Sequence, residues 1–165
     1  CLLNGAFEKH SHIPPYRLSR GLMVLDFFEH YDPFSFKEAF DFEGIEPFTL
    51  IIVESTPETR IFEVRWDEKT LSFNELPNSK AQIWSSATLY PRAIAEQRAG
   101  WFAKWLENNQ EFHQEHIIKF HKKGGQGDLW NDFIMKRGDN LQTVSITSIQ
   151  KNKPKKAFFR LKASL

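Results

Sequence analysis

The most reactive side chain in this sequence belongs to its single cysteine, Cys1. A cysteine at the start of a chain can use its own α-amine as a general base and attack a carbonyl as a covalent nucleophile. The alternative is a thiol that is buried in a β-strand of a longer protein and exposed here only because the chain is cut at this point, which the following Leu2 and Leu3 favour. Thiol reactivity also requires an electropositive setting, and the neighbouring sequence indicates none. A lone cysteine excludes an internal disulfide framework and a cysteine-rich zinc site.

Six histidines raise the question of a metal centre. His10 and His12 are two residues apart in a predicted loop, whereas His113 and His116 are three apart and would share a helix face. The sequence lacks the His-Glu-x-x-His pattern of zinc hydrolases. We therefore predict no metal site and expect hydrogen-bonded structural histidines.

Two further segments contain polar or flexible residues that could serve a site. Residues 83–90 include Ser85, Ser86 and Thr88 just before a predicted helix, and helix capping accounts for one or two of these hydroxyls at most. Neither serine has an adjacent base, so the segment does not indicate a serine nucleophile. Residues 123–128 are rich in glycine but lack the Gly-Lys-Ser/Thr ending of a P-loop, which favours a mobile loop.

The elements that must position these residues begin with a strand over residues 1–4 and a loop over residues 5–16. A helix is predicted from Ser19 to a residue before Pro33, because the position preceding a proline disfavours helical backbone. The apolar face expected for that helix consists of Leu22, Val24, Leu25 and Phe28. A second short helix is predicted with Asp32 as its N-cap and Pro33 in its first turn. Its expected apolar face consists of Phe36, Ala39 and Phe40.

The middle of the chain predicts a β-meander. Residues 48–53 form a continuous apolar run, which is typical of a central strand. Residues 60–66 alternate, so that Phe62, Val64 and Trp66 should share one face. A third strand is predicted over residues 70–76 and a fourth, shorter one over residues 82–86.

The remaining elements are two helices and a hairpin. The first helix has Pro91 in its opening turn and runs to about Asn108, and the second covers about residues 112–121. Strands are predicted over residues 143–150 and 157–161, joined by a turn. This order of elements indicates an α+β fold rather than a βαβ winding.

Composition sets limits on the function. A chain of 165 residues with 41% hydrophobic residues suits a single domain, residues 1–165, with a real core. Residues 121–165 carry ten basic and three acidic residues, but the whole chain has a net charge of only +1 and no nucleic-acid-binding motif. We therefore predict no nucleic-acid partner. The longest apolar run is too short to cross a bilayer, so we predict no membrane span and a cytoplasmic protein.

Five segments, taken in order, carry a resemblance to a known family. They are CLLNGAFEKH (1–10), YRLSRG (16–21), GIEPFT (44–49), IWSSATLY (83–90) and TVSIT (143–147). Together they resemble bacterial members of the NRDE-motif family, also called the transport and Golgi organisation protein two family. The resemblance implies an αββα sandwich of mainly antiparallel sheets, similar to N-terminal nucleophile hydrolases.

The chain also departs from the family pattern. Family members begin Met-Cys-Thr and carry an Asn-Arg-Asp-Glu motif, neither of which occurs here. Cys1 instead matches an internal strand of the family. We therefore expect the chain to be the C-terminal part of such a domain, without its first strands, and inactive because the cysteine nucleophile lies upstream.

The resemblance implies site residues and a substrate class. The substrate would be a small-molecule amide, cleaved at its C–N bond without a cofactor. The residues expected to act in catalysis are Asn4, Ser85, Ser86 and Thr143, and those expected to bind substrate are Arg137, Ser145 and His121. Asn4 could donate its amide toward an oxyanion, and Arg137 could bind an anionic group bidentately. The alternative is a non-enzymatic protein that handles haem or a lipid as an amphipathic ligand, with His10, His12 or His121 as an axial haem ligand.

Overall fold

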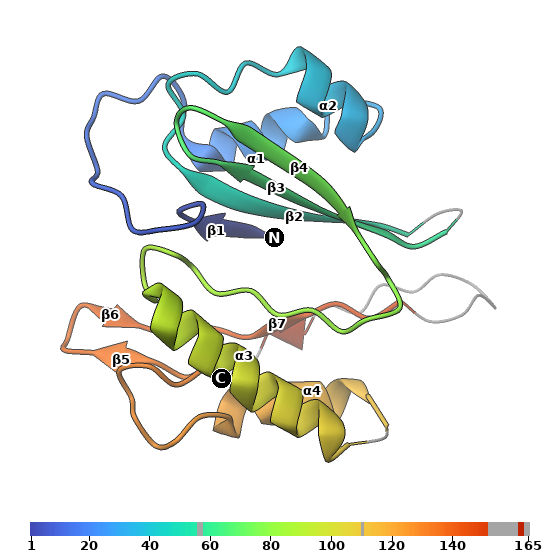
Figure 1. The fold of residues 1–165 in the computed structure, drawn as a ribbon, viewed down its shortest axis with the longest axis vertical. Helices are drawn as coiled ribbons and strands as arrows, with labels where there is room; N and C mark the ends of the chain where they lie inside the picture. The colour runs from blue at the N-terminus through green and yellow to red at the C-terminus, as the bar shows by residue number, and fades with distance from the viewer. Residues whose placement is uncertain (56–57, 110, 152–161, 164–165) are drawn as a thin grey trace. The chain divides into compact units, whose positions relative to one another are not determined.

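The computed structural model describes residues 1–55, 58–109, 111–151 and 162–163. The chain divides into two compact units, residues 1–95 and 96–165 (Figure 1). Helices and antiparallel sheets both occur, which confirms the α+β class. The expectation of a single domain stays a prediction.

The first unit contains a four-stranded antiparallel sheet in the order β1-β2-β3-β4 (Figure 1). Its strands are β1 (Leu2–Asn4), β2 (Phe48–Glu54), β3 (Arg60–Trp66) and β4 (Leu71–Leu76). Leu50 of β2 pairs with Leu2 on one side and with Val64 on the other, so β2 is an interior strand as its apolar run predicts. The first three predicted strands of the meander are thereby confirmed.

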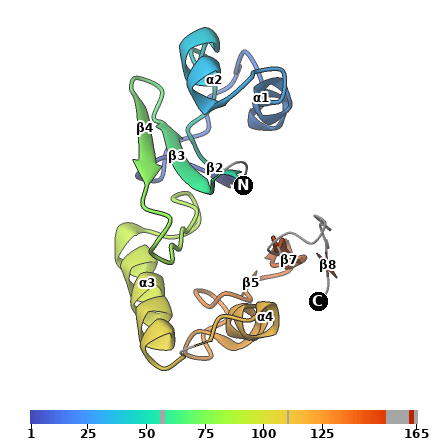
Figure 2. The ribbon, with the colours of Figure 1, turned by 90° about the vertical axis from the view of Figure 1, so that its right-hand side faces the viewer.

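Two helices, α1 (Arg20–Phe27) and α2 (Pro33–Ala39), cover one face of this sheet (Figures 1 and 2). Ser19 caps α1 by accepting a hydrogen bond from the Leu22 amide at 3.2 Å. The side chain of Asp32 accepts a 2.7 Å hydrogen bond from the Ser35 amide, and the Ser35 hydroxyl accepts one from the Asp32 amide. This capping box, with Pro33 at the first position, confirms the predicted start of the second helix.

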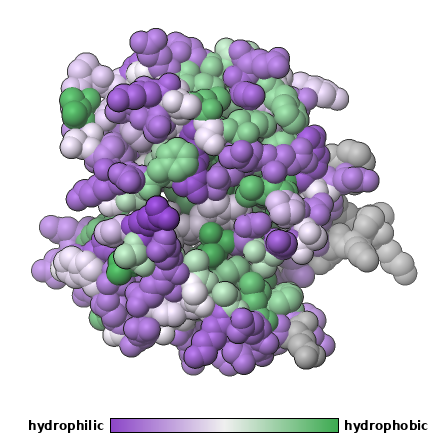
Figure 3. Space-filling model, in the orientation of Figure 1, coloured by the Kyte–Doolittle hydropathy of each residue, from purple (hydrophilic) through white to green (hydrophobic). Residues whose placement is uncertain are grey.

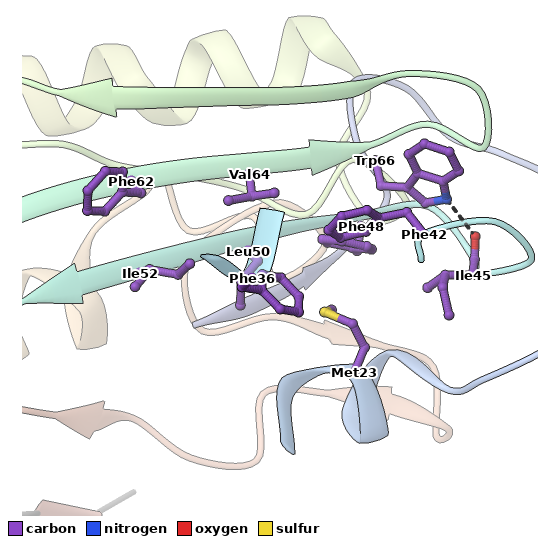
Figure 4. Packing of buried hydrophobic residues seen from close by; sticks show 10 residues of the cluster. All are labelled: Met23, Phe36, Phe42, Ile45, Phe48, Leu50, Ile52, Phe62, Val64 and Trp66. Carbon is purple, nitrogen blue, oxygen red and sulfur yellow. Dashed lines mark hydrogen bonds between the residues drawn. The ribbon is translucent and has the colours of Figure 1, made fainter. Parts of the chain in front are cut away.

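The hydrophobic core of this unit lies between the two helices and the sheet (Figure 4). Phe62, Val64 and Trp66 share the helix-facing side of the sheet, as their alternation predicts. The Trp66 indole donates a 3.0 Å hydrogen bond to the carbonyl of Ile45, which satisfies its polar atom inside the core. The buried members of the cluster are Met23, Phe36, Phe42, Ile45, Phe48, Leu50, Ile52, Phe62, Val64 and Trp66.

The predicted buried face of α1 is wrong at three of its four positions, and only Val24 packs as expected. Leu22, Leu25 and Phe28 are 52%, 62% and 73% exposed, whereas Met23 is fully buried. Partly buried Val24 and Phe27 also pack against the core, which gives the helix an inner face one position away from the predicted one. The helix is apolar on both sides, so the pattern could not distinguish them. Ala39 of α2 is likewise exposed.

The fourth predicted strand, residues 82–86, is not a strand in the structure. Side-chain hydrogen bonds, rather than a ladder of backbone hydrogen bonds, fix the position of this segment. The Trp84 indole donates a 2.7 Å hydrogen bond to Glu63, and the Ser86 hydroxyl donates one of 2.8 Å to the Asn4 carbonyl. The segment is therefore held to the sheet of its own unit by side chains, without adding a strand to it.

The second unit begins within α3 (Arg92–Glu107) and includes α4 (Gln114–Lys123), both of which are labelled in Figure 2. Both helices were predicted. Two short antiparallel pairs follow, β5 (Lys136–Arg137) with β6 (Leu141–Gln142) and β7 (Thr147–Ser148) with β8 (Lys162–Ala163).

The strand predicted over residues 143–150 is reduced to the two residues of β7. Thr143 is not part of β7. Its amide donates a hydrogen bond to the Met135 carbonyl, and its hydroxyl accepts one from the Met135 amide, just before β5. Almost all of the predicted turn over residues 151–156, and the predicted strand over residues 157–161, lie outside the described residues.

A buried carboxylate organises the glycine-rich loop of this unit. Asp132 accepts hydrogen bonds from the amides of Gln126 at 2.9 Å and Gly127 at 2.8 Å. A Cβ on Gly125, whose φ is +122°, would lie 2.1 Å from the Asp132 carboxylate. Buried Arg98 donates hydrogen bonds to the main-chain carbonyls of Asp132 and its neighbour Asn131. The loop is thus closed around a side chain of its own unit.

The visible surface is mostly hydrophilic, with smaller apolar areas between polar ones (Figure 3). Within the described residues, no helix combines the length and the apolar character that crossing a membrane requires.

Candidate functional site

The end of β1 is where two predicted site residues meet. Ser86, 9% exposed, donates its hydroxyl to the main-chain carbonyl of Asn4 at 2.8 Å. The Thr88 hydroxyl lies 3.0 Å from that of Ser86. Gly5 allows this close approach, because a Cβ at its φ of +81° would lie 3.1 Å from side-chain carbons of Ala87 and Thr88. Asn4 and Ser86 are therefore neighbours in space, and Ser85 directly precedes Ser86 in the sequence.

The Asn4 residue also lines a cavity of about 430 Å³ in the first unit, which we call the Glu46 cavity. Its described lining residues come from β1, the 5–16 loop, the start of α1 and the segment before β2. They are Leu2, Asn4, His12, Tyr16, Leu18, Ser19, Arg20, Gly21 and Glu46.

Glu46 is the charged centre of this cavity. Its Oε1 atom lies 3.0 Å from His10 Nε2 and 2.9 Å from His12 Nδ1, and its Oε2 atom lies 2.9 Å from Arg20 Nη2. Burial alone would raise the pKa of Glu46, but the hydrogen bonds of His12 and His10 and the charge of Arg20 lower it below its ordinary value. The carboxylate is therefore ionised at neutral pH and paired with a guanidinium.

The position of His10 indicates which of its tautomers is present. Its Nδ1 atom is buried and has no hydrogen-bond partner in the described part of the chain. A proton there would be buried without an acceptor, which is costly. We infer that His10 carries its proton on Nε2 and donates it to Glu46. His10 thus anchors the 5–16 loop to the carboxylate.

Backbone contacts dock the start of α1 onto the segment that carries Glu46. Leu18 forms a parallel bridge with Ile45, and the Arg17 amide donates a 2.7 Å hydrogen bond to the Gly44 carbonyl. Gly44 has a φ of +70°, and a Cβ there would lie 3.0 Å from the Arg17 Cβ. Glycine is therefore strongly favoured where the two segments meet.

The other predicted site residues lie in the second unit. The Thr143 hydroxyl accepts a 2.9 Å hydrogen bond from the Met135 amide, and Arg137 Nε donates to the Trp130 carbonyl at 2.8 Å. Ser145 is exposed and lies between β6 and β7. His121 Nδ1 is 2.9 Å from the Ile117 carbonyl within α4. That these residues form one site with Asn4 stays a prediction.

The sequence did not indicate the cluster around Glu46. Arg20 and Glu46 stand inside two segments that carry the family resemblance, and that was the available signal. Their contact joins positions that are 26 residues apart, and His10 is 36 residues from Glu46. No spacing rule for helices or strands predicts such a pair.

Two expectations concern reactive groups. Cys1 is a free, exposed cysteine, and burial of its thiol in a strand of the complete domain stays a prediction. His10 and His12 share Glu46, so axial ligation of haem by His10 Nε2 or His12 Nδ1 would break one of those hydrogen bonds. In the described ranges, no group of three His, Cys, Asp or Glu residues is placed to hold a metal ion.

No protein-family model, curated protein or solved structure matches this chain.

Proposed function

We propose that the chain is part of an NRDE-family protein that hydrolyses the C–N bond of a small amide, and that the Glu46 cavity holds the substrate. The supporting observation is a convergence in space. The described lining residues, apart from His12, all come from the segments 1–10, 16–21 and 44–49, which carry the resemblance. A fourth such segment, 83–90, holds the end of β1 through the hydrogen bond from Ser86.

We infer that the first unit supplies one helical layer and one sheet layer of a four-layer αββα sandwich. Helices α1 and α2 cover one face of the sheet (Figure 2). On the other face of β2, Thr49 and Ile51 are only 3% and 6% exposed. A strand buried on both faces supports a layered arrangement of this kind.

In the proposed reaction the nucleophile is a cysteine that precedes residue 1 in the complete protein, as the family resemblance implies. Its α-amine accepts the thiol proton, and the sulfur attacks the amide carbonyl carbon. The C–N bond then breaks, and the leaving amine takes the proton from the α-ammonium group. Water hydrolyses the remaining thioester to a carboxylic acid and restores the thiol.

The residues of this chain would bind and orient the substrate. Asn4 lines the cavity at the end of β1, where its side-chain amide can donate to the oxyanion. Ser86 acts as a positioning residue, because its hydroxyl fixes the Asn4 carbonyl. Arg20 and His12 line the cavity and both contact Glu46, and Arg20 also donates to the Pro47 carbonyl, so the remaining N–H groups of these side chains would bind an anionic group of the substrate. Catalytic roles for Ser85 and Thr143, and substrate-binding roles for Arg137, Ser145 and His121, belong to the same proposal.

The test uses the complete gene product, whose N-terminal residues and intact mass are determined first. The protein is then treated with p-nitrophenyl acetate, which is neutral, or with mono-p-nitrophenyl succinate, which is anionic. Peptide mass mapping should locate the acyl group on the N-terminal cysteine. We expect Arg20→Ala to slow acylation by the succinate about tenfold and by the acetate much less. Lys9→Ala, at an exposed cation of the 5–16 loop that does not line the cavity, is the control.

A folded protein whose N-terminal cysteine stays unlabelled would overturn the enzymatic proposal. The alternative, haem or lipid handling without chemistry, predicts that result together with a shifted absorption band when haem is added. If Arg20→Ala slowed acylation by both esters equally, the assignment of the Glu46 cavity as the substrate site would be overturned, but the enzymatic proposal would stand.

A further inference from the structure

The second unit contains an aromatic groove between α3 and α4. Two cavities of about 380 and 400 Å³ share Trp105, Asn109, Phe120 and Gly124 as lining residues. The rings of Trp105 and Phe120 lie 4.9 Å apart between centroids, and Phe102 stacks beside Trp105 at 5.9 Å. Trp105 and Phe120 therefore line the groove as an aromatic wall, and Phe102, which is in neither lining, packs against Trp105.

The charged side chains of the lining are all lysines. Lys119 and Lys123 of α4 line one cavity together with His116, and Lys104 of α3 lines the other. The described lining residues include no carboxylate, and none of the three lysines forms an ion pair within the described part of the chain. Cations gathered beside an apolar wall repel one another, and an anion bound there would relieve that repulsion.

A close glycine contact shapes the end of the groove where α4 stops. A Cβ on Gly124 would lie 2.6 Å from the Phe120 carbonyl and 2.9 Å from the Phe133 ring. A side chain at position 124 would require Phe120 or Phe133 to shift, and Phe120 is buried and in contact with Trp105. The glycine therefore keeps the aromatic wall and the cationic last turn of α4 together.

We propose that this groove binds a small planar aromatic anion, such as an aromatic carboxylate or sulfonate. The ligand ring packs against Trp105, and its anionic group lies at Lys119 and Lys123. The aromatic wall favours a flat ring over an aliphatic chain, and the lysines select the negative charge. The inference does not depend on the proposed hydrolysis, because all of its residues belong to the second unit.

The test is calorimetric titration of the full 165-residue chain with 2-naphthoate. We expect Lys119→Ala/Lys123→Ala to weaken binding about tenfold or more, and to reduce its dependence on salt. Both lysines are exposed on a helix, so this variant should fold. Lys69→Ala/Lys80→Ala, at exposed lysines of the first unit, is the matched control and should bind as the wild type does. Trp105→Leu should also weaken binding, as a probe of the wall.

Two comparison ligands make the proposal specific. 2-Naphthalenemethanol, which lacks the charge, and octanoate, which lacks the ring, should each bind about tenfold more weakly than 2-naphthoate. Absence of 2-naphthoate binding, or binding unchanged in the double lysine variant, would overturn the proposal. Octanoate binding as tightly as 2-naphthoate would overturn the aromatic ligand class and indicate an acyl-chain site.

Discussion

The Ser86 hydroxyl donates a 2.8 Å hydrogen bond to the Asn4 carbonyl across 82 residues of sequence. This bond fixes the end of the edge strand β1 against a segment that belongs to no strand. The same carbonyl also accepts a longer contact of 3.4 Å from the Thr88 amide. The place at which the Glu46 cavity meets the sheet therefore depends on a side chain from a distant part of the chain.

Ser86→Ala should lower the free energy of unfolding of the chain by about 1–2 kcal/mol, because it removes a hydrogen bond at a buried site. Urea unfolding monitored by tryptophan fluorescence measures this change. Ser79→Ala, at an exposed serine, should stay within about 0.5 kcal/mol of the wild type. Equal effects of the two substitutions would show that the Asn4 bond contributes nothing.

The folded state should lose stability in acid partly through Glu46. Its pKa is lower in the folded protein than the ordinary value of a glutamate, so its contribution to stability is complete above that ordinary value and is lost as the pH falls through the folded value. Glu46→Gln should therefore be less stable than the wild type at neutral pH, and the gap should narrow in acid. Urea midpoints measured from about pH 7 to pH 3 test this. Glu58→Gln, at an exposed carboxylate, should show no comparable narrowing.

The glycine-rich loop provides a test of the Asp132 contact. Gly125→Ala should destabilise the chain by about 2 kcal/mol or more, since the new Cβ would meet the Asp132 carboxylate. Gly127→Ala also has a positive φ but meets no atom within 4 Å, so strain of about 1 kcal/mol is expected. Gly100→Ala, in open space on α3, should stabilise by about 0.5–1 kcal/mol. Thermal unfolding should rank Gly100→Ala as the most stable variant and Gly125→Ala as the least stable. Any other order would contradict the surroundings of the three glycines in the structure.

Helix α1 offers a direct comparison of the two faces. Met23→Ala should cost about 2–5 kcal/mol, because it leaves a cavity among fully buried residues. Leu25→Ala should change stability by less than about 0.5 kcal/mol, because that side chain is mostly exposed. Chemical denaturation of both variants measures the difference. If Leu25→Ala lost more unfolding free energy than Met23→Ala, the face predicted from the sequence would be the buried one.

The elements that could be predicted are those with a strong local signal. Alternation identified β3, and the Asp32-Pro33 pair located the start of α2. The face of α1 could not be predicted, because apolar residues lie all around its eight positions and only packing against the sheet selects Met23. The local sequence of residues 82–86 predicts a strand, but the structure has none there. The segment is held by side-chain hydrogen bonds, such as that of Trp84 to Glu63, which the local sequence does not indicate.

The candidate site was predictable only in part, for a related reason. Asn4 and Ser86 could be named from the family resemblance, and the structure brings them together. Arg20 and Glu46 carry no local sign that they meet, since their ion pair depends on how a loop and a helix end dock. Contacts of this kind arise from tertiary structure and leave no period in the sequence.

The arrangement at Glu46 also has a consequence for how substitutions combine. One carboxylate has three partners, at His10, His12 and Arg20, which all depend on the same two oxygen atoms. Losses at these positions will therefore not add, because removing Glu46 removes all three contacts at once. After that removal, a further change at His10 or Arg20 should cost less than it costs in the wild type. In evolutionary terms, the tolerance of each of these positions is conditional on the residue at position 46.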